Sequence, residues 1–188
     1  MTVAQASLFC TPTPIAGVMV VKRIQRGDQR GMFERMYDKD LLASFGWTSD
    51  VVQVNHSVTR GKGTVRGMHF QRAPFSEYKL VSCLVGEVWD VALDLRRGSP
   101  SFLQHFAVKL SPHEANALLI PPGCAHGFQT LTEQVDMLYC HNQPYMKSHE
   151  DGINASDPRL NLVWPLEITQ RSERDLEFAY LTPSFEGV

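Results

Sequence analysis

The chain has 188 residues, of which 20% are charged, and its formal net charge is −2. This length permits one folded unit with a full hydrophobic core. The balanced charge argues against the broad basic surface of a nucleic-acid-binding protein. No run of about 18 apolar residues is present, so no membrane-spanning helix is expected. Residues 1–14 carry no positive charge, so no secretory signal is expected either.

The cysteines give no sign of a disulfide framework. Cys10, Cys83, Cys124 and Cys140 lie far apart and include no C-x-x-C pair. We therefore expect reduced thiols in a cytoplasmic protein.

The first third of the chain predicts few regular elements. Residues 1–16, with Pro12 and Pro14, are expected to form a loosely held arm. Residues 17–24 read as a strand, and the glycines and aspartate of 27–31 indicate a turn. Leu41, Leu42 and Phe45 predict a short helix over 38–45 that ends before glycine 46.

From residue 51 the pattern is that of short strands separated by glycine and proline. The expected strands are 51–58, 63–71, 78–85, 87–95, 102–110, 117–120, 127–131 and 135–140. Strands about 8–12 residues apart indicate an all-β sandwich or barrel. A short helix is expected over 171–178, with Ser172 as its cap and Asp175 at its third position. We expect one domain over 1–188, with 167–188 as a C-terminal extension.

One segment concentrates chemical groups. His69 follows Arg66 by three residues, and Lys79 comes ten residues later. In a regular strand Arg66 and His69 would face opposite ways, unless Gly67 forms a bulge. A base and two cations around one cavity suit removal of a proton beside a carbonyl group in an anionic substrate.

A second segment, 121–127, has the P-x-G-x-x-H form of cupin double-stranded β-helices, with His126 as its histidine. Metal-binding cupins pair it with an upstream H-x-H, whereas this chain has His69-Phe70-Gln71. Two histidines leave even an open catalytic metal site one ligand short, although Glu77 or Glu87 could be proposed as a third. No metal is therefore expected.

With further segments, the chain resembles the dTDP-4-dehydrorhamnose 3,5-epimerases, which are metal-free cupins of bacterial sugar-nucleotide metabolism. Matching segments occur in the family's order between residues 17 and 166. They include D-x-R-G-x-F at 28–33, Q-x-N-x-S at 53–57, G-x-x-R-G-x-H-F-Q at 63–71 and I-P-x-G-x-A-H-G-F at 120–128. The resemblance implies a jelly-roll cupin with short peripheral helices, a homodimer, and no cofactor, nucleic-acid partner or membrane partner.

The resemblance also implies roles for individual residues. His69 would be the general base, Asp157 its carboxylate partner, Tyr139 the acid on the opposite face of the sugar, and Lys79 the cation near the ketone oxygen. Residues that would bind substrate are Arg30, Phe33, Gln53 and Asn55 at the nucleotide end, some reaching from a second subunit, and Arg66 at the diphosphate. His126 would either contact substrate or only hydrogen-bond within the barrel. Arg35 stands where the family has a glutamate, with Glu34 one place earlier.

The implied function is epimerisation of dTDP-4-dehydro-6-deoxyglucose to dTDP-4-dehydrorhamnose at carbons 3 and 5, through an enolate, in dTDP-rhamnose or O-antigen lipopolysaccharide biosynthesis. An alternative is an enzyme that inverts only one carbon, or one that acts on a related nucleotide 4-keto sugar. A third reading is a cupin that binds a sugar nucleotide without turnover, which would have no need of an acid–base pair.

Overall fold

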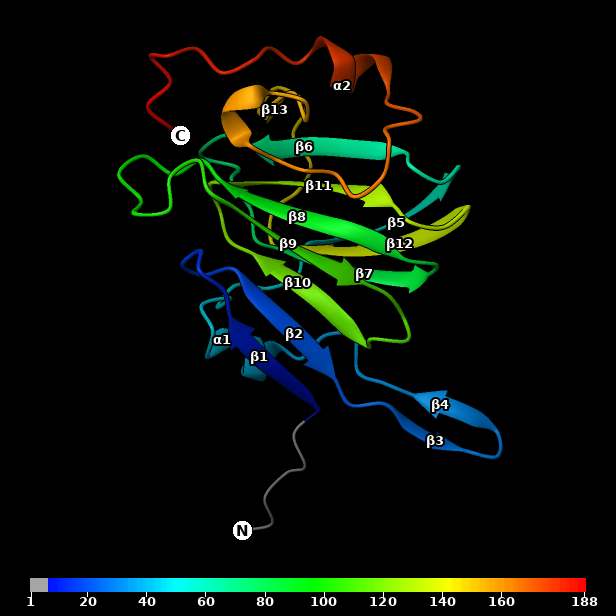
Figure 1. Ribbon diagram of the computed structural model, residues 1–188. Helices are drawn as coiled ribbons and strands as arrows, with labels where there is room; N and C mark the ends of the chain where they lie inside the picture. The colour runs from blue at the N-terminus through cyan, green and yellow to red at the C-terminus, as the bar shows by residue number, and fades with distance from the viewer. Residues whose placement is uncertain (1–6) are drawn as a thin grey trace.

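The computed structural model describes residues 7–188 and consists mainly of two antiparallel sheets that face one another (Figure 1). One sheet has six strands, in the order β1 (Leu8–Pro12), β2 (Met19–Arg23), β10 (Asn116–Ile120), β7 (Lys79–Val85), β12 (Gln134–His141) and β5 (Gln53–Arg60). The other has five, in the order β13 (Glu150–Gly152), β6 (Val65–Gln71), β11 (Cys124–Thr130), β8 (Val88–Asp94) and β9 (His105–Leu110). The predicted all-β fold is confirmed.

Alternation along the strands builds the core between the sheets. On β12, Val135 and Met137 face inward with Tyr139, and they pack against Val88 and Phe128 of the opposite sheet. Side chains at alternate positions of the same strands face outward into separate apolar clusters. Tyr139 and Phe128 therefore lie at the boundary between this apolar core and the cavity described below.

The N-terminal segment departs from the sequence prediction. Residues 1–6 of the expected loose arm lie outside the described residues, but Leu8–Pro12 forms strand β1, paired antiparallel with β2. Leu8 is buried and joins Leu42 and Trp47 in the cluster that covers the outer face of the six-stranded sheet. Prolines at the end of the segment do not prevent pairing, because an edge strand tolerates a missing donor.

Residues expected to form only a turn extend into a hairpin. Strands β3 (Arg26–Asp28) and β4 (Gly31–Phe33) pair with each other alone and project from the sandwich (Figure 1). Every residue of both strands is exposed. The hairpin therefore gains nothing from burial within its own chain.

Both predicted helices are present. Helix α1 (Lys39–Ala43) begins after Asp38, whose carboxylate accepts from the Leu41 N–H, and the chain turns at Gly46 with a positive φ of 102°. Helix α2 (Glu173–Glu177) begins after Ser172, whose hydroxyl accepts from the Asp175 N–H. A 3₁₀ turn (Pro158–Leu160) precedes it. None of the helices within residues 7–188 is long and apolar enough to cross a membrane.

The C-terminal tail packs against the five-stranded sheet. Gln170 forms an isolated bridge with Thr64, and α2 lies beside β6 (Figure 1). Leu181 and Leu160 join the outer cluster of that sheet. The tail is consequently built into the fold next to the strand that carries His69.

Candidate active site

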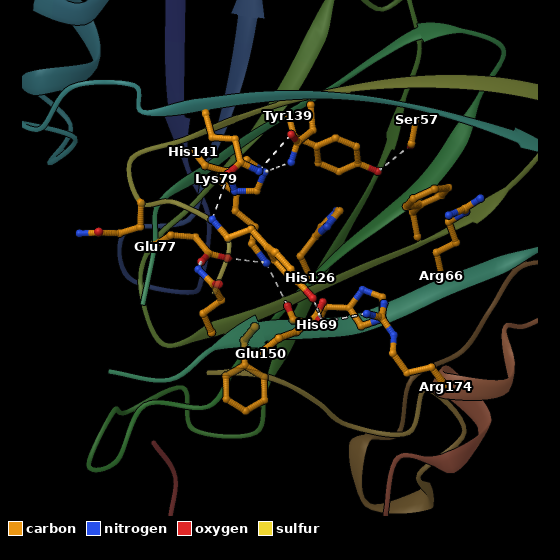
Figure 2. Close-up of a pocket in the computed structure, with 17 residues that line it drawn as sticks. Ser57, Arg66, His69, Glu77, Lys79, His126, Tyr139, His141, Glu150 and Arg174 are labelled. Atoms are coloured by element: carbon orange, nitrogen blue, oxygen red, sulfur yellow. Dashed lines mark hydrogen bonds and ion pairs between the residues drawn. The ribbon is translucent and has the colours of Figure 1, made fainter. Parts of the chain in front are cut away.

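A cavity of about 280 Å³ opens between the two sheets and gathers most of the predicted site residues (Figure 2). Both sheets contribute to its wall, so side chains from opposite layers face one another across it. The predicted residues that line it are Gln53, Asn55, Arg66, His69, Lys79, His126 and Tyr139. Three predicted residues, Arg30, Phe33 and Asp157, do not line it.

A β-bulge brings Arg66 and His69 to the same cavity. His69 pairs with His126 and Arg66 pairs with Phe128, so β6 places one more residue than β11 between these two pairs. Gly67 occupies the bulge with φ of 122°, and a Cβ there would lie 2.5 Å from the Cα of the facing strand. The bulge reverses the alternation of side chains, as a glycine at this position allows.

The base candidate His69 is paired with Asp175. Its Nε2 lies 2.7 Å from Asp175 Oδ1, and the Gly67 N–H donates to Oδ2 at 3.1 Å. Burial acts to raise the pKa of Asp175, but hydrogen bonds from His69, Gly67 and Ser172 outweigh it and the pKa is lowered. A carboxylate that stays ionised can accept the Nε2 proton and stabilise an imidazolium, leaving Nδ1 as the basic nitrogen.

The prediction that Asp157 pairs with His69 is wrong. Asp157 is buried, and its carboxylate caps the 3₁₀ turn by accepting from the Arg159 N–H at 2.9 Å. It also accepts from the Leu181 N–H, which ties the tail to that turn. These backbone donors occupy the carboxylate, so its role is structural. The pairing of His69 with Asp175 spans 106 residues of chain and has no local pattern to reveal it.

Lys79 is held in place by an ion pair and a hydrogen bond. Its Nζ lies 3.0 Å from Glu77 Oε1 and donates to the His69 carbonyl at 3.1 Å. Glu77 is buried and also accepts from the amide of Gln71. An ammonium group has three N–H donors. One donates to the His69 carbonyl, while the contact with Glu77 is an ion pair, so the ammonium group can still donate to an oxygen atom in the cavity.

Tyr139 and His126 form a second polar group. The Tyr139 hydroxyl lies 3.4 Å from Ser57 Oγ, and burial raises the pKa of this phenol, so it stays protonated. His126 Nε2 lies 2.8 Å from the buried carboxylate of Asp90. The rings of His126 and Tyr139 meet edge to face at 6.0 Å. His126 therefore both borders the cavity and hydrogen-bonds within the barrel.

Sequence reasoning missed a polar network on the tail side. Arg174 Nη1 donates to Glu150 Oε2 at 2.8 Å, and its Nη2 lies 3.1 Å from His69 Nε2, a contact that is no hydrogen bond while Nε2–H donates to Asp175. The Tyr145 hydroxyl donates to the same Glu150 oxygen at 2.8 Å. Arg174 directly precedes Asp175 on α2, so one short helix delivers two charged groups to the proposed base. Only the predicted cap at Ser172 pointed to this helix.

Arg30 and Phe33 lie on the projecting hairpin. The Arg30 guanidinium pairs with Asp28 of the same hairpin, and 66% of the Phe33 surface is exposed. Neither reaches the cavity of its own chain. Arg35, just beyond the hairpin, pairs with Asp38 at 2.7 Å, while Glu34 pairs with Arg23.

Across the described chain, no three histidine, cysteine, aspartate or glutamate side chains are grouped so that they could hold a metal ion. The upstream histidine of the cupin pattern pairs with Asp175 and the downstream one with Asp90. Two facing sheets with an imidazole–carboxylate pair, an ammonium group and a phenol around one cavity define a cupin-type protein equipped for acid–base chemistry.

Comparison with known proteins identifies the family. The sequence profile described as dTDP-4-dehydrorhamnose 3,5-epimerase matches residues 12–182. The enzyme of that name from Shigella flexneri is 38% identical over 165 residues, covering 87% of this chain and 91% of its own. The chain belongs to the dTDP-4-dehydrorhamnose 3,5-epimerase family, as its sequence motifs predicted, and the prediction of an isomerase is confirmed.

Solved structures agree with this assignment. The dTDP-6-deoxy-D-glucose-3,5-epimerase of Legionella pneumophila, in complex with dTDP-4-keto-L-rhamnose, is 36% identical with a TM-score of 0.87, covering 92% of both chains. A 3'-monoepimerase from Streptomyces bikiniensis, in complex with dTDP-quinovose, is 28% identical with a TM-score of 0.83, covering 90% of this chain and 86% of its own. The same fold therefore serves enzymes that invert one carbon and enzymes that invert two.

Proposed function

We propose that this protein epimerises a dTDP-linked 4-keto-6-deoxyhexose at carbons 3 and 5, with His69 as the base and Tyr139 as the acid. One observation carries the proposal: His69 lies on the five-stranded sheet, whereas Tyr139 and Lys79 lie on the six-stranded sheet across the cavity. Figure 2 places Tyr139 at the top of the cavity and His69 below it. Inversion needs a base on one face of the sugar and a proton donor on the other.

The proposed reaction moves two protons at each carbon. His69 Nδ1 takes the proton beside the ketone, and the resulting imidazolium is stabilised by Asp175. The ammonium group of Lys79 donates to the enolate oxygen, which stabilises the charge that develops there. Tyr139 then protonates the carbon from the opposite face. Exchange of protons with solvent returns His69 and Tyr139 to their starting states.

Deuterium exchange tests this function. The protein is incubated in heavy water with dTDP-4-keto-6-deoxyglucose, and the sugar protons are followed by NMR. Exchange with inversion at two carbons is expected. Exchange at one carbon would favour a mono-epimerase, the activity of the similar protein from Streptomyces bikiniensis. The absence of exchange at any carbon would instead favour a cupin that binds the sugar nucleotide without turnover.

We also propose that the protein is a homodimer in which each hairpin serves the partner's cavity. The support is that Arg30 and Phe33 are exposed and lie away from their own cavity, while β5 is an edge strand with Val54 exposed, directly after exposed Val52. An exposed aromatic and cation suit the base and phosphates of a nucleotide.

Mixed dimers test this arrangement. His69→Ala and Phe33→Ala should each have low activity alone. A mixed dimer should regain activity, because one of its two sites would have both wild-type residues. Failure of mixing to restore any activity, in a sample shown by light scattering to be dimeric, would place Phe33 in its own subunit's site.

The unpaired cysteines support a reducing, cytoplasmic location.

A further inference from the structure

His141 borders the cavity although no sequence motif gave it a role. It lies on β12 two residues after Tyr139, so both side chains face inward. Their rings are nearly parallel, with centroids 6.2 Å apart and an angle of 20° between planes. Figure 2 shows His141 on the same side of the cavity as Tyr139 and Lys79. Within residues 7–188, the only hydrogen-bond contact of its ring is with the Asn55 amide, 3.5 Å from Nε2.

A backbone group fixes the direction of the amides beside His141. The Tyr145 backbone N–H donates to Gln53 Oε1 at 3.0 Å. A backbone nitrogen cannot accept, so Gln53 must present its oxygen there and its Nε2 elsewhere. That Nε2 donates to Asn55 Oδ1 at 3.0 Å. The oxygen and nitrogen of a side-chain amide are told apart by such hydrogen bonds, and here the Tyr145 backbone N–H fixes both amides.

The direction of these amides determines the proton position on His141. Because Asn55 Oδ1 is used by Gln53, the Asn55 group that faces His141 Nε2 is the Nδ2 donor. A proton on Nε2 would place two donors against each other. Burial, and then the charges of Lys79 and His126, lower the pKa of His141 to about 4, so the ring is neutral near pH 7. Its single proton therefore lies on Nδ1.

We infer that His141 binds substrate through its Nδ1–H, which donates a hydrogen bond to an oxygen of the nucleotide sugar, and that Gln53 and Asn55 position this donor. His141 pairs in register with Lys79 on one side and Gln53 on the other. It thus lies between the proposed ketone site and the proposed nucleotide end. The acceptor is a phosphate or a sugar oxygen. The substrate class rests on the function proposed above.

The proton position can be measured without any turnover. In protein labelled with ¹⁵N-histidine, long-range ¹H–¹⁵N spectra report which ring nitrogen is protonated, and loss of the signal in His141→Phe assigns it. Nδ1–H is expected at neutral pH. Asn55→Asp should move the proton to Nε2, because a carboxylate only accepts. A wild-type ring protonated at Nε2, or at both nitrogens, would overturn the inference even if the epimerase activity is as proposed.

Binding and kinetics test the contact itself. His141→Phe keeps the ring but removes the donor, so KM should rise about three- to tenfold, the effect of one hydrogen bond, with kcat little changed. His141→Asn, which can place an amide donor near the Nδ1 position, should recover part of that loss. His113→Phe, at an exposed turn histidine, is the matched control.

Binding of dTDP alone identifies the acceptor. Weaker dTDP binding by His141→Phe would indicate a phosphate oxygen. Unchanged dTDP binding with a raised KM would indicate a sugar oxygen. If both quantities equal those of the wild type, His141 does not bind substrate. The dTDP measurement needs no catalysis, so a protein that binds but does not epimerise would still give an answer.

Discussion

The five-stranded sheet brings His69 to the cavity, and the six-stranded sheet brings Lys79 and Tyr139. The first sheet depends on the C-terminal tail, which supplies Asp175 and Arg174 to His69. The second does not use the tail for Lys79, which is held by Glu77 and by the His69 carbonyl of the facing sheet. Under the proposed mechanism, one wall and the tail supply the base and its carboxylate, while the other wall supplies the cation that stabilises the enolate and the acid that returns a proton.

The largest effect is expected on the wall that removes the proton. His69→Asn should lower deuterium exchange and inversion together by about 10²–10⁴-fold, because the variant removes the proposed general base. NMR in heavy water measures both rates, and circular dichroism checks the fold. Exchange near the wild-type rate would assign the base to another residue and remove the distinction between the walls.

The tail should matter nearly as much. Asp175→Asn removes the charge that stabilises imidazolium, and a charge-assisted hydrogen bond contributes about 1.5–3 kcal/mol, or roughly 10- to 100-fold in exchange rate. Asp157→Asn is the matched control. It should leave the exchange rate nearly unchanged while lowering the thermal midpoint, since Asp157 only caps the turn and anchors Leu181. The reverse order of effects would restore Asp157 as the partner of His69.

Tyr139, on the opposite wall, should decide which product forms without affecting removal of the first proton. Tyr139→Phe keeps the ring and its packing but removes the hydroxyl. Inversion should fall by about 10²–10⁴-fold, the contribution of a general acid, while His69 still removes the proton and returns it to the same face. The variant should wash deuterium into the substrate with little inverted product. Inversion at the wild-type rate would show that another group or water supplies the proton.

The smallest effect concerns Arg35, which lies just beyond the hairpin and belongs to neither wall. Arg35→Glu places an acceptor where the guanidinium has none, and thymine has an N3–H to donate whereas cytosine has none, so the ratio of dTDP to dCDP affinity should rise by at most about tenfold, with turnover little changed. Titration calorimetry measures both affinities. Arg97→Glu, at an exposed arginine that pairs with Glu186, provides the control. An unchanged ratio would place Arg35 outside the nucleotide site.

Sequence alone was enough for elements defined by local periodicity and for residues fixed by motif. The strand that contains His69, Lys79 at the start of β7, and the cap at Ser172 were all predicted within a few residues. Strand β1 was missed because the burial of Leu8 against Leu42 and Trp47 involves residues distant in the chain. Pro12 and Pro14, which are typical of loops, dominated the local sequence pattern there.

What only the tertiary structure decided is which groups meet. Asp157 and Asp175 both precede or begin short helical turns and look alike in sequence, yet one binds backbone N–H groups and the other binds His69. The bulge at Gly67 and the proton on His141 are likewise set by neighbouring strands and amides. Local sequence fixes backbone preferences over a few residues, whereas a hydrogen bond across 106 residues depends on how the tail closes over the sheet.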